Sequence, residues 1–144
     1  MPGIGLARTY YALEQDVTGL LYIIGGTDGT EILDTLISYS PIEKRCTFLT
    51  PMTECRCYVS SASLNGCIYA IGGHNGINRL DTCERYDLAR DAWTLVATMN
   101  VIRSDASAVA FNGKVYVAGG MNVEDVEKSV EGISRLFKDF MKNY

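Results

Sequence analysis

The sequence repeats with a period of 47 residues, and this periodicity restricts the fold more than any other feature. A glycine pair recurs at Gly25-Gly26, Gly72-Gly73 and Gly119-Gly120, so the step is 72 − 25 = 47 and then 119 − 72 = 47. The same step relates other identical residues: Gly19, Gly66 and Gly113; Tyr22, Tyr69 and Tyr116; Tyr39 and Tyr86; Met52 and Met99; Arg56 and Arg103. Periods of about 20 to 50 residues are typical of chains in which each repeat is one supersecondary unit packed on its neighbours.

Within each repeat the local patterns predict short antiparallel strands. The segments LLYIIGG, CIYAIGG and KVYVAGG are rich in β-branched and aromatic residues and end at the glycine pair. Asn65-Gly66 and Asn112-Gly113 predict two-residue hairpin turns. The last two strands are expected around aromatic residues: Tyr39 or Tyr86 in the third strand and Phe48 or Trp93 in the fourth. Each repeat is therefore expected to be a four-stranded antiparallel meander, in an all-β chain.

The repeat pattern is complete twice and then stops. Two full units are expected at about residues 8–52 and 56–99, and half of a third, with two strands, at 105–119. Residues 122–144 contain apolar residues at three- and four-residue steps, which predicts an amphipathic C-terminal α-helix without a third or fourth strand. This helix is expected to pack on the exposed last unit, to bind a partner, or to be a poorly ordered tail.

Composition excludes several classes of protein. The 144 residues carry 13 basic and 17 acidic side chains, a net charge of −4, which argues against nucleic acid as a partner. No apolar run has the roughly 20 residues that a membrane helix needs, and the N-terminal residues do not resemble a secretion signal. The five cysteines have no disulfide or zinc spacing. We therefore expect reduced thiols, a cytoplasmic protein, and neither a metal nor another cofactor.

The unit resembles the Kelch repeat of β-propellers, because it combines four strands, a glycine pair, a later tyrosine and a tryptophan. The resemblance covers about residues 8–121 and implies a partial propeller over residues 1–121, read as a fragment, a short isoform or a divergent gene product. It assigns structural roles to the repeated residues: Gly25, Gly26, Tyr39, Gly72, Gly73, Tyr86, Trp93, Gly119 and Gly120. Cys46 stands where the second repeat has Trp93, so Phe48 is expected to pack the first unit instead.

Meander geometry also predicts a binding face. The connections between strands two and three, and between successive units, emerge on one side and carry polar residues. The candidate partner-binding residues are Arg56, Arg103, Asp28, His74, Asn75, Asn78 and Arg79. In Kelch proteins, arginines at this position and residues after the glycine pair often contact partner peptides. The alternative is that both arginines stiffen the turns by bonding to loop carbonyls, and that Asp28, Asp81 and Asp105 form turns.

No catalytic motif is present: the sequence lacks a phosphate-binding loop, a zinc-protease motif, a nucleophile elbow and a dinucleotide fingerprint. We therefore do not expect an enzyme. The strings RCYVS, RLDTCERYD, WTLVATM and RSDASA are similar to the kelch-like family. That resemblance implies the substrate-recognition part of a cullin-3 ubiquitin ligase adaptor, which reaches cullin-3 only through a BTB domain. BTB and BACK domains are expected to be absent here. The alternative is an actin-associated Kelch scaffold without a role in ubiquitination.

Overall fold

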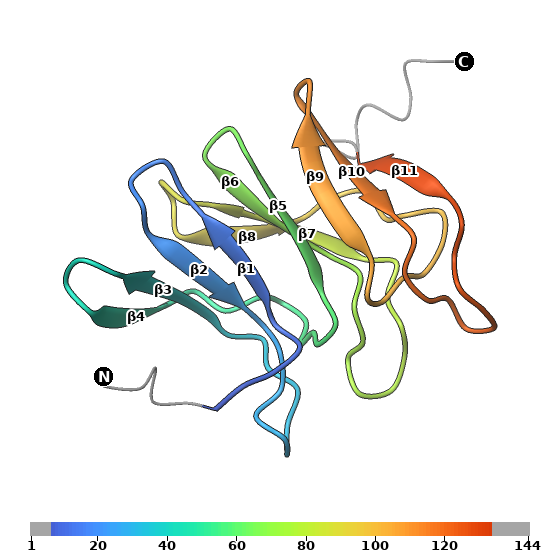
Figure 1. Cartoon of the computed structure of the whole chain (residues 1–144), viewed down its shortest axis with the longest axis horizontal. Helices are drawn as coiled ribbons and strands as arrows, with labels where there is room; N and C mark the ends of the chain where they lie inside the picture. Colours follow the sequence, from blue (N-terminus) through green and yellow to red (C-terminus); the bar gives the residue numbers. More distant parts are fainter. Residues whose placement is uncertain (1–6, 134–144) are drawn as a thin grey trace.

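The computed structural model describes residues 7–133, which form three antiparallel β-sheets side by side (Figure 1). We call the sheets blades. Blade 1 contains β1 (Ala12–Gln15), β2 (Leu21–Ile24), β3 (Leu36–Ser40) and β4 (Arg45–Leu49). Blade 2 contains β5 (Ser60–Leu64), β6 (Cys67–Ile71), β7 (Cys83–Asp87) and β8 (Ala92–Leu95). Blade 3 contains β9 (Ser107–Phe111), β10 (Lys114–Ala118) and β11 (Val130–Ile133). Two complete four-stranded meanders are therefore confirmed, and the arrangement fits part of a β-propeller.

The predicted hairpin turns are confirmed by their backbone conformation. Asn65 and Gly66 have φ values of 50° and 71°, and Asn112 and Gly113 have values of 48° and 74°. Two successive residues with positive φ make the turn whose twist matches that of the flanking strands. These turns set the register of β5 against β6 and of β9 against β10.

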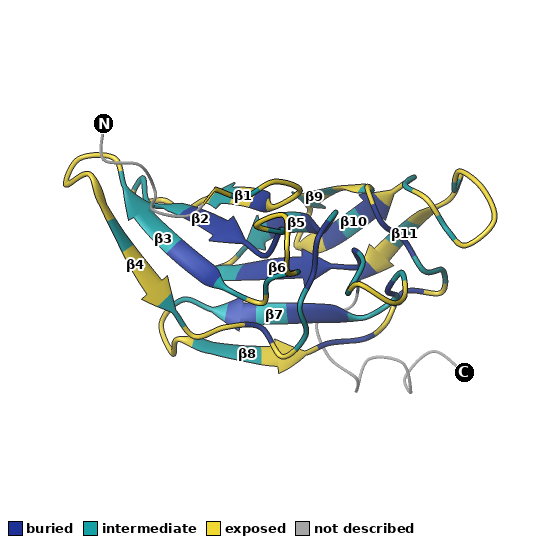
Figure 2. Cartoon of the chain, turned by 90° about the horizontal axis from the view of Figure 1, so that it is seen from below, coloured by how far each residue is buried: buried dark blue, intermediate teal, exposed yellow. Residues whose placement is uncertain are grey.

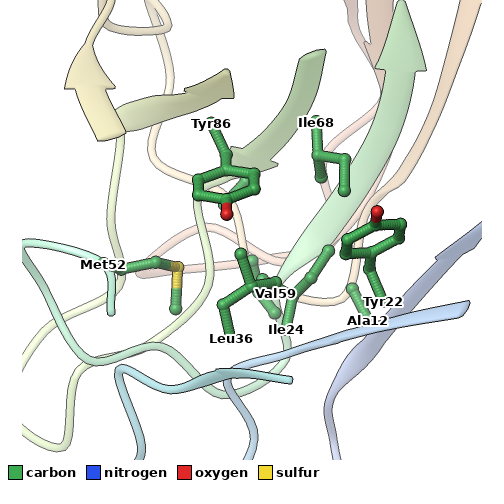
Figure 3. Packing of buried hydrophobic residues seen from close by; sticks show 9 residues of the cluster. Ala12, Tyr22, Ile24, Leu36, Met52, Val59, Ile68 and Tyr86 are labelled. Carbon is green, nitrogen blue, oxygen red and sulfur yellow. The ribbon is translucent and has the colours of Figure 1, made fainter. Parts of the chain in front are cut away.

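The core lies between the blades. In blade 2, the face toward blade 1 contributes Ile68, Ala70 and Tyr86 to a cluster with Tyr22, Ile24 and Leu36. The side chains of Ile68 and Tyr86 point toward those of Tyr22, Ile24 and Leu36 (Figure 3). The opposite face contributes Ala62, Tyr69, Ile71 and Cys83 to a second cluster with Val115, Val117 and Ile133 of blade 3. We call the face toward the next blade along the chain the forward face, and the other the rear face. Burial is concentrated on the inner strands, and β4 and β8 are more exposed (Figure 2).

The same three backbone hydrogen bonds join each pair of blades. Between blades 1 and 2, Arg56 N donates to Leu33 O (3.0 Å), Gly26 N donates to Arg56 O (2.7 Å), and Tyr58 N donates to Tyr10 O (2.9 Å). Their equivalents between blades 2 and 3 are Arg103 N to Leu80 O (3.0 Å), Gly73 N to Arg103 O (2.8 Å), and Asp105 N to Tyr58 O (3.0 Å). The sequence repeat is therefore also a repeat of the junction.

The predicted C-terminal helix is wrong for residues 122–133. Asn122 Oδ1 accepts the N–H groups of Glu124 and Asp125 (both 2.8 Å), which forms a turn, and β11 then pairs with β10 as a third strand. Val123 and Val126 are exposed in the turn and Val130 lies on the strand, so their helix-like spacing does not place them on one helical face. Residues 134–144 of the predicted helix lie outside the described part of the chain.

Phe48 does not replace the tryptophan of the second repeat. It is paired with Ile37 on the rear face of blade 1 and its side chain is 61% exposed. Cys46 occupies the position opposite Tyr39, as Trp93 does opposite Tyr86. Trp93 packs on Tyr86 with ring centroids 5.1 Å apart, and its Nε1 donates to the carbonyl of Thr50, the residue that follows β4 of blade 1 (2.8 Å). Blade 1 therefore lacks a bulky side chain at this position.

Candidate functional site

Five connections emerge on one side of the three sheets, and we call this side the loop face (Figure 1). It comprises residues 25–35, 72–82 and 119–129, which follow the glycine pairs, and residues 50–59 and 96–106, which link successive blades. Because the sheets are antiparallel meanders, the tight β1–β2, β5–β6 and β9–β10 turns lie at the opposite ends of the strands. The connections on the loop face are longer than these turns.

Each loop after a glycine pair is built on one turn-forming side chain. Asp28 Oδ1 accepts the Thr30 N–H (2.8 Å), the Thr30 hydroxyl (2.7 Å) and the Glu31 N–H (2.8 Å). Bonds from the Glu31 and Thr30 backbones lower the pKa of Asp28 to about 2, so it remains ionised at neutral pH. Asn75 Oδ1 accepts the N–H groups of Ile77 and Asn78 in the same way. Two of the predicted partner-binding residues, Asp28 and Asn75, therefore shape their own loops.

The other predicted residues of the blade 2 loop differ in accessibility. His74 is half-buried and its Nδ1 accepts the Gly76 N–H (2.9 Å), whereas Asn78 is exposed. Arg79 Nε donates to Ser104 Oγ (3.0 Å), and that hydroxyl donates to Asp105 Oδ2 (2.9 Å). This chain of bonds links the blade 2 loop to the start of blade 3.

The structure does not place Arg56 and Arg103 where a partner could reach them, because they are 0% and 1% exposed. Arg56 donates to the carbonyls of Gly72 (2.8 Å) and Thr82 (2.9 Å) and pairs with Glu84, which is fully buried (3.1 Å). The alternative role, bonding to loop carbonyls, matches these contacts. Binding lost in an Arg56 variant would report damage to the fold.

Arg103 repeats this arrangement in blade 3. It donates to the carbonyls of Gly119 (2.8 Å) and Ser129 (3.1 Å), and pairs with Glu131 (2.9 Å). Glu84 and Glu131 each also accept an N–H from the connection that leads into their blade, that of Thr53 (2.8 Å) and that of Asn100 (2.6 Å) respectively. Although burial opposes ionisation, the Asn100 N–H and the Arg103 guanidinium lower the pKa of Glu131. These buried arginine–glutamate pairs therefore fix the backbone at both ends of the loops that follow the glycine pairs in blades 2 and 3.

Blade 1 departs from this pattern. Arg8 keeps its bonds to Gly25 O (2.9 Å) and Thr35 Oγ1 (3.1 Å), but the position of Glu84 is taken by Ile37, since 84 − 47 = 37. Among residues 7–133, the buried Nε and Nη2 of Arg8 have no hydrogen-bond partner. Burial accordingly lowers the pKa of Arg8.

Sequence reasoning missed three residues at the inner edge of the loop face: Tyr10, Tyr58 and Asp105. Their φ values are 57°, 53° and 57°, in the left-handed region that side chains other than glycine avoid. Each such residue costs about 1–3 kcal/mol, and such strain gathers at functional sites. The rings of Tyr10 and Tyr58 lie 4.2 Å apart, and burial raises the pKa of Tyr58. The sequence did mark these positions as equivalent, because each of the three residues follows the repeated arginine by two positions.

The exposed charge on the loop face is mostly negative. The exposed carboxylates are Asp28, Glu31, Asp34, Asp105, Glu124 and Asp125, while Lys128 is the exposed base of the described loops. Together with the tyrosine pair, these side chains offer stacking surfaces and hydrogen-bond acceptors. Such a surface is suited to recognising a polypeptide.

Neither a metal site nor a membrane helix was found in the described residues. No group of three or more His, Cys, Asp or Glu within residues 7–133 is arranged to hold a metal ion. A search of the same residues found no helix with the length and hydropathy needed to span a bilayer.

Comparison with known families gives one match. A family model of the Kelch motif matches residues 17–53, 55–100 and 102–131, so each matched segment covers most of one blade. A search of curated proteins found no match.

Proposed function

Because the chain belongs to the Kelch-repeat family, we propose that it is a protein-binding module that docks a peptide segment of its partner on the loop face. Kelch repeats are typically protein–protein interaction modules and are generally non-catalytic. The observation that supports this site best is the row of Tyr10, Tyr58 and Asp105, which keep a costly backbone conformation at equivalent positions of three blades.

The proposed site combines a rigid base with accessible side chains. Tyr10 is 51% exposed and Asp105 is exposed, while the backbone of all three residues is tied together by the bonds between blades. A preorganised backbone reduces the entropy that is lost on binding. Asn78 and the exposed loop-tip residue Ile77 lie on the same face and extend the proposed contact.

We further propose that this module belongs to the kelch-like family, in which its sequence resembles kelch-like protein 10. It would then recognise the substrate of a cullin-3 ubiquitin ligase adaptor in the cytoplasm, and reach cullin-3 only through a BTB domain. The motifs quoted from the sequence support this finer proposal. The alternative, an actin-associated scaffold, shares the same loop face and differs in its partner.

Selection from a random peptide library displayed on phage tests the proposed site. Peptides selected on the purified chain should bind at least about tenfold more weakly to Tyr58→Asn and Asp105→Asn, a loss typical of interface residues. Asparagine tolerates positive φ, so these variants remove the side-chain chemistry and keep the backbone conformation. Ile42→Asn is the matched control, because Ile42 is 92% exposed in the β3–β4 turn on the opposite side. Equal affinity for all four proteins would exclude the loop face.

Two further measurements separate the adaptor from the scaffold. Co-sedimentation with filamentous actin should leave the chain in the supernatant if it is an adaptor module. A protein carrying a selected peptide should co-precipitate with cullin-3 only when a BTB-containing partner is present. Recovery of the chain in the actin pellet would favour the scaffold.

A further inference from the structure

We infer that two copies of this chain associate head to tail: blade 3 of each copy packs against blade 1 of the other, and the two contacts close a ring of six blades. Blades 1 and 3 lie at the two ends of the row of sheets, and each has backbone groups that could join it to a further blade (Figure 1). By the 47-residue step, blade 3 presents the Gly120 N–H and the carbonyls of Asp105 and Glu127 at its forward side. No residue in the range 7–133 makes a backbone bond to these three groups.

The rear side of blade 1 presents the complementary groups. They are the N–H and carbonyl of Arg8 and the N–H of Tyr10, which likewise make no backbone bond to another described residue. If blade 3 joins blade 1 of the second copy in the way that the internal blades join one another, all six backbone groups find a partner. The pairs are Arg8 N with Glu127 O, Gly120 N with Arg8 O, and Tyr10 N with Asp105 O. The chain thus carries both halves of its own junction.

The forward face of blade 3 is apolar and open. Val109, Phe111 and Val130 are 61%, 64% and 64% exposed, and β9 and β11 show this exposure in Figure 2. Their equivalents in blade 2 are Ala62, Leu64 and Cys83, which belong to or pack against the cluster that blade 3 covers. The repeat therefore indicates that another blade covers this face.

The rear face of blade 1 has the apolar pattern that such a cover requires. Leu21, Ile23 and Tyr39 correspond to Val115, Val117 and Ile133, the residues with which blade 3 covers blade 2. Ile23 and Ile37 are already buried, so the accessible part consists of the half-buried Leu21 and Tyr39 with Leu13 and Phe48, which are 53% and 61% exposed. In the internal junctions, the buried carboxylates of Glu84 and Glu131 each need an N–H donor from outside their blade. Ile37 stands at the same position in blade 1, so this face has no such carboxylate.

Gly119 supplies an independent argument. A Cβ at Gly25 or Gly72 would collide with the carbonyl oxygen of the arginine in the following blade, whereas at Gly119 the nearest described atom would be Glu127 O at 3.7 Å. Gly119 thus keeps the space that this carbonyl occupies at the internal junctions, and Arg8 O of the second copy fits there. Two identical head-to-tail contacts close a ring when the rotation allows it. Six blades lie within the about four to eight that propellers contain.

Sedimentation equilibrium of the whole chain tests this inference. The expected species is a dimer of twice 15.8 kDa. Phe111→Glu and Leu13→Lys, at opposite ends, should each raise the dissociation constant by roughly 100-fold, because each buries an unpaired charge at both junctions. Val17→Glu is the control, since Val17 is fully exposed in the β1–β2 turn. Far-ultraviolet circular dichroism establishes that each variant is folded.

Mixing the two defective variants, F111E and L13K, tests the head-to-tail arrangement itself. A mixed dimer has one unmodified junction and one that contains both the introduced carboxylate and the introduced ammonium group, so the dimer should reappear. A face-to-face contact between identical blades would stay broken. A wild-type chain that is monomeric at all concentrations, a folded F111E variant as dimeric as wild type, or a mixture that remains monomeric would overturn the inference, as would open polymers larger than a dimer.

Discussion

Arg56 and Arg8 occupy equivalent positions, and replacing each with methionine should have very different effects on stability. Arg56→Met removes the counter-charge of Glu84, whose side chain is 0% exposed, together with bonds to two loop carbonyls. Removing one partner of a buried ion pair costs about 3–5 kcal/mol, because the other charge remains buried and uncompensated. Arg8→Met leaves no carboxylate behind, since Ile37 stands at that position.

The cost of Arg8→Met follows from its few contacts. It loses hydrogen bonds to Gly25 O and Thr35 Oγ1, but it also removes two buried nitrogens that have no partner among the described residues. The lost bonds and the removed desolvation penalty are each of order 1–3 kcal/mol, so the net cost should be about 1 kcal/mol or less. The predicted difference between the two variants is therefore about 3 kcal/mol.

Urea unfolding followed by the fluorescence of Trp93, the single tryptophan, measures this difference. If Arg56→Met is unfolded without denaturant, the double variant Arg56→Met/Glu84→Met keeps the test informative. Removing both charges should restore part of the stability, because an apolar pair replaces an unpaired buried carboxylate. Equal destabilisation by Arg8→Met and Arg56→Met, or no recovery in the double variant, would refute the reasoning.

Three further predictions concern thiols, pH and backbone strain. Burial raises the pKa of Cys83 to about 12, so this thiol should react with Ellman's reagent at pH 8 only after unfolding, while the half-exposed Cys46 reacts in the native state; equal rates would contradict this. The pKa of Glu131 in the folded chain lies below its usual 4.5, so the ionised carboxylate stabilises the fold above that pH and Glu131→Gln should lower the thermal unfolding midpoint at pH 7. The difference in midpoint between the variant and wild type should shrink as the pH falls below 4.5, and a difference that does not depend on pH would be inconsistent with this reasoning. In the dissociated F111E variant, where no second copy lies against Gly119, Gly72→Ala places a Cβ against the Arg103 carbonyl and should destabilise the chain by about 1–3 kcal/mol more than Gly119→Ala, measured by thermal unfolding; equal shifts would argue against the collision.

The blades could be predicted from the sequence because a repeat supplies many concordant observations of one pattern. Three glycine pairs and two Asn-Gly turns locate the strands, and long-range packing then repeats as the sequence does. The helix prediction failed where local periodicity was weighed above the 47-residue step. That step places the equivalent of β7, which begins at Cys83, at residue 83 + 47 = 130, where β11 begins. Tertiary pairing with β10 thus decided the structure of a segment whose spacing also suits a helix.

The partner-binding prediction did not anticipate the burial of Arg56 and Arg103, because exposure is a property of three-dimensional packing. Arg56 and Arg103 each find their glutamate 28 residues downstream, so the pairs Arg56–Glu84 and Arg103–Glu131 were visible as a repeated spacing. When a basic residue and an acidic residue recur together at the same spacing in successive repeats, the pattern is as typical of an internal ion pair as of a binding site. The tyrosines and Asp105 were harder to find, since positive φ at residues other than glycine leaves no trace in composition.

These two sets of residues are mechanically connected. Asp105 lies two residues after Arg103, and its N–H bonds to Tyr58 O, so the buried pair fixes the start of the strained segment and the junction bond fixes its end. A strained residue keeps its conformation only when its surroundings over-determine it. Weakening Arg103–Glu131 should therefore let Asp105 relax before blade 3 unfolds. Binding at the loop face should accordingly decline in Glu131→Gln under conditions where circular dichroism still reports a folded chain, and binding that tracks only the folded fraction would show that the two are uncoupled.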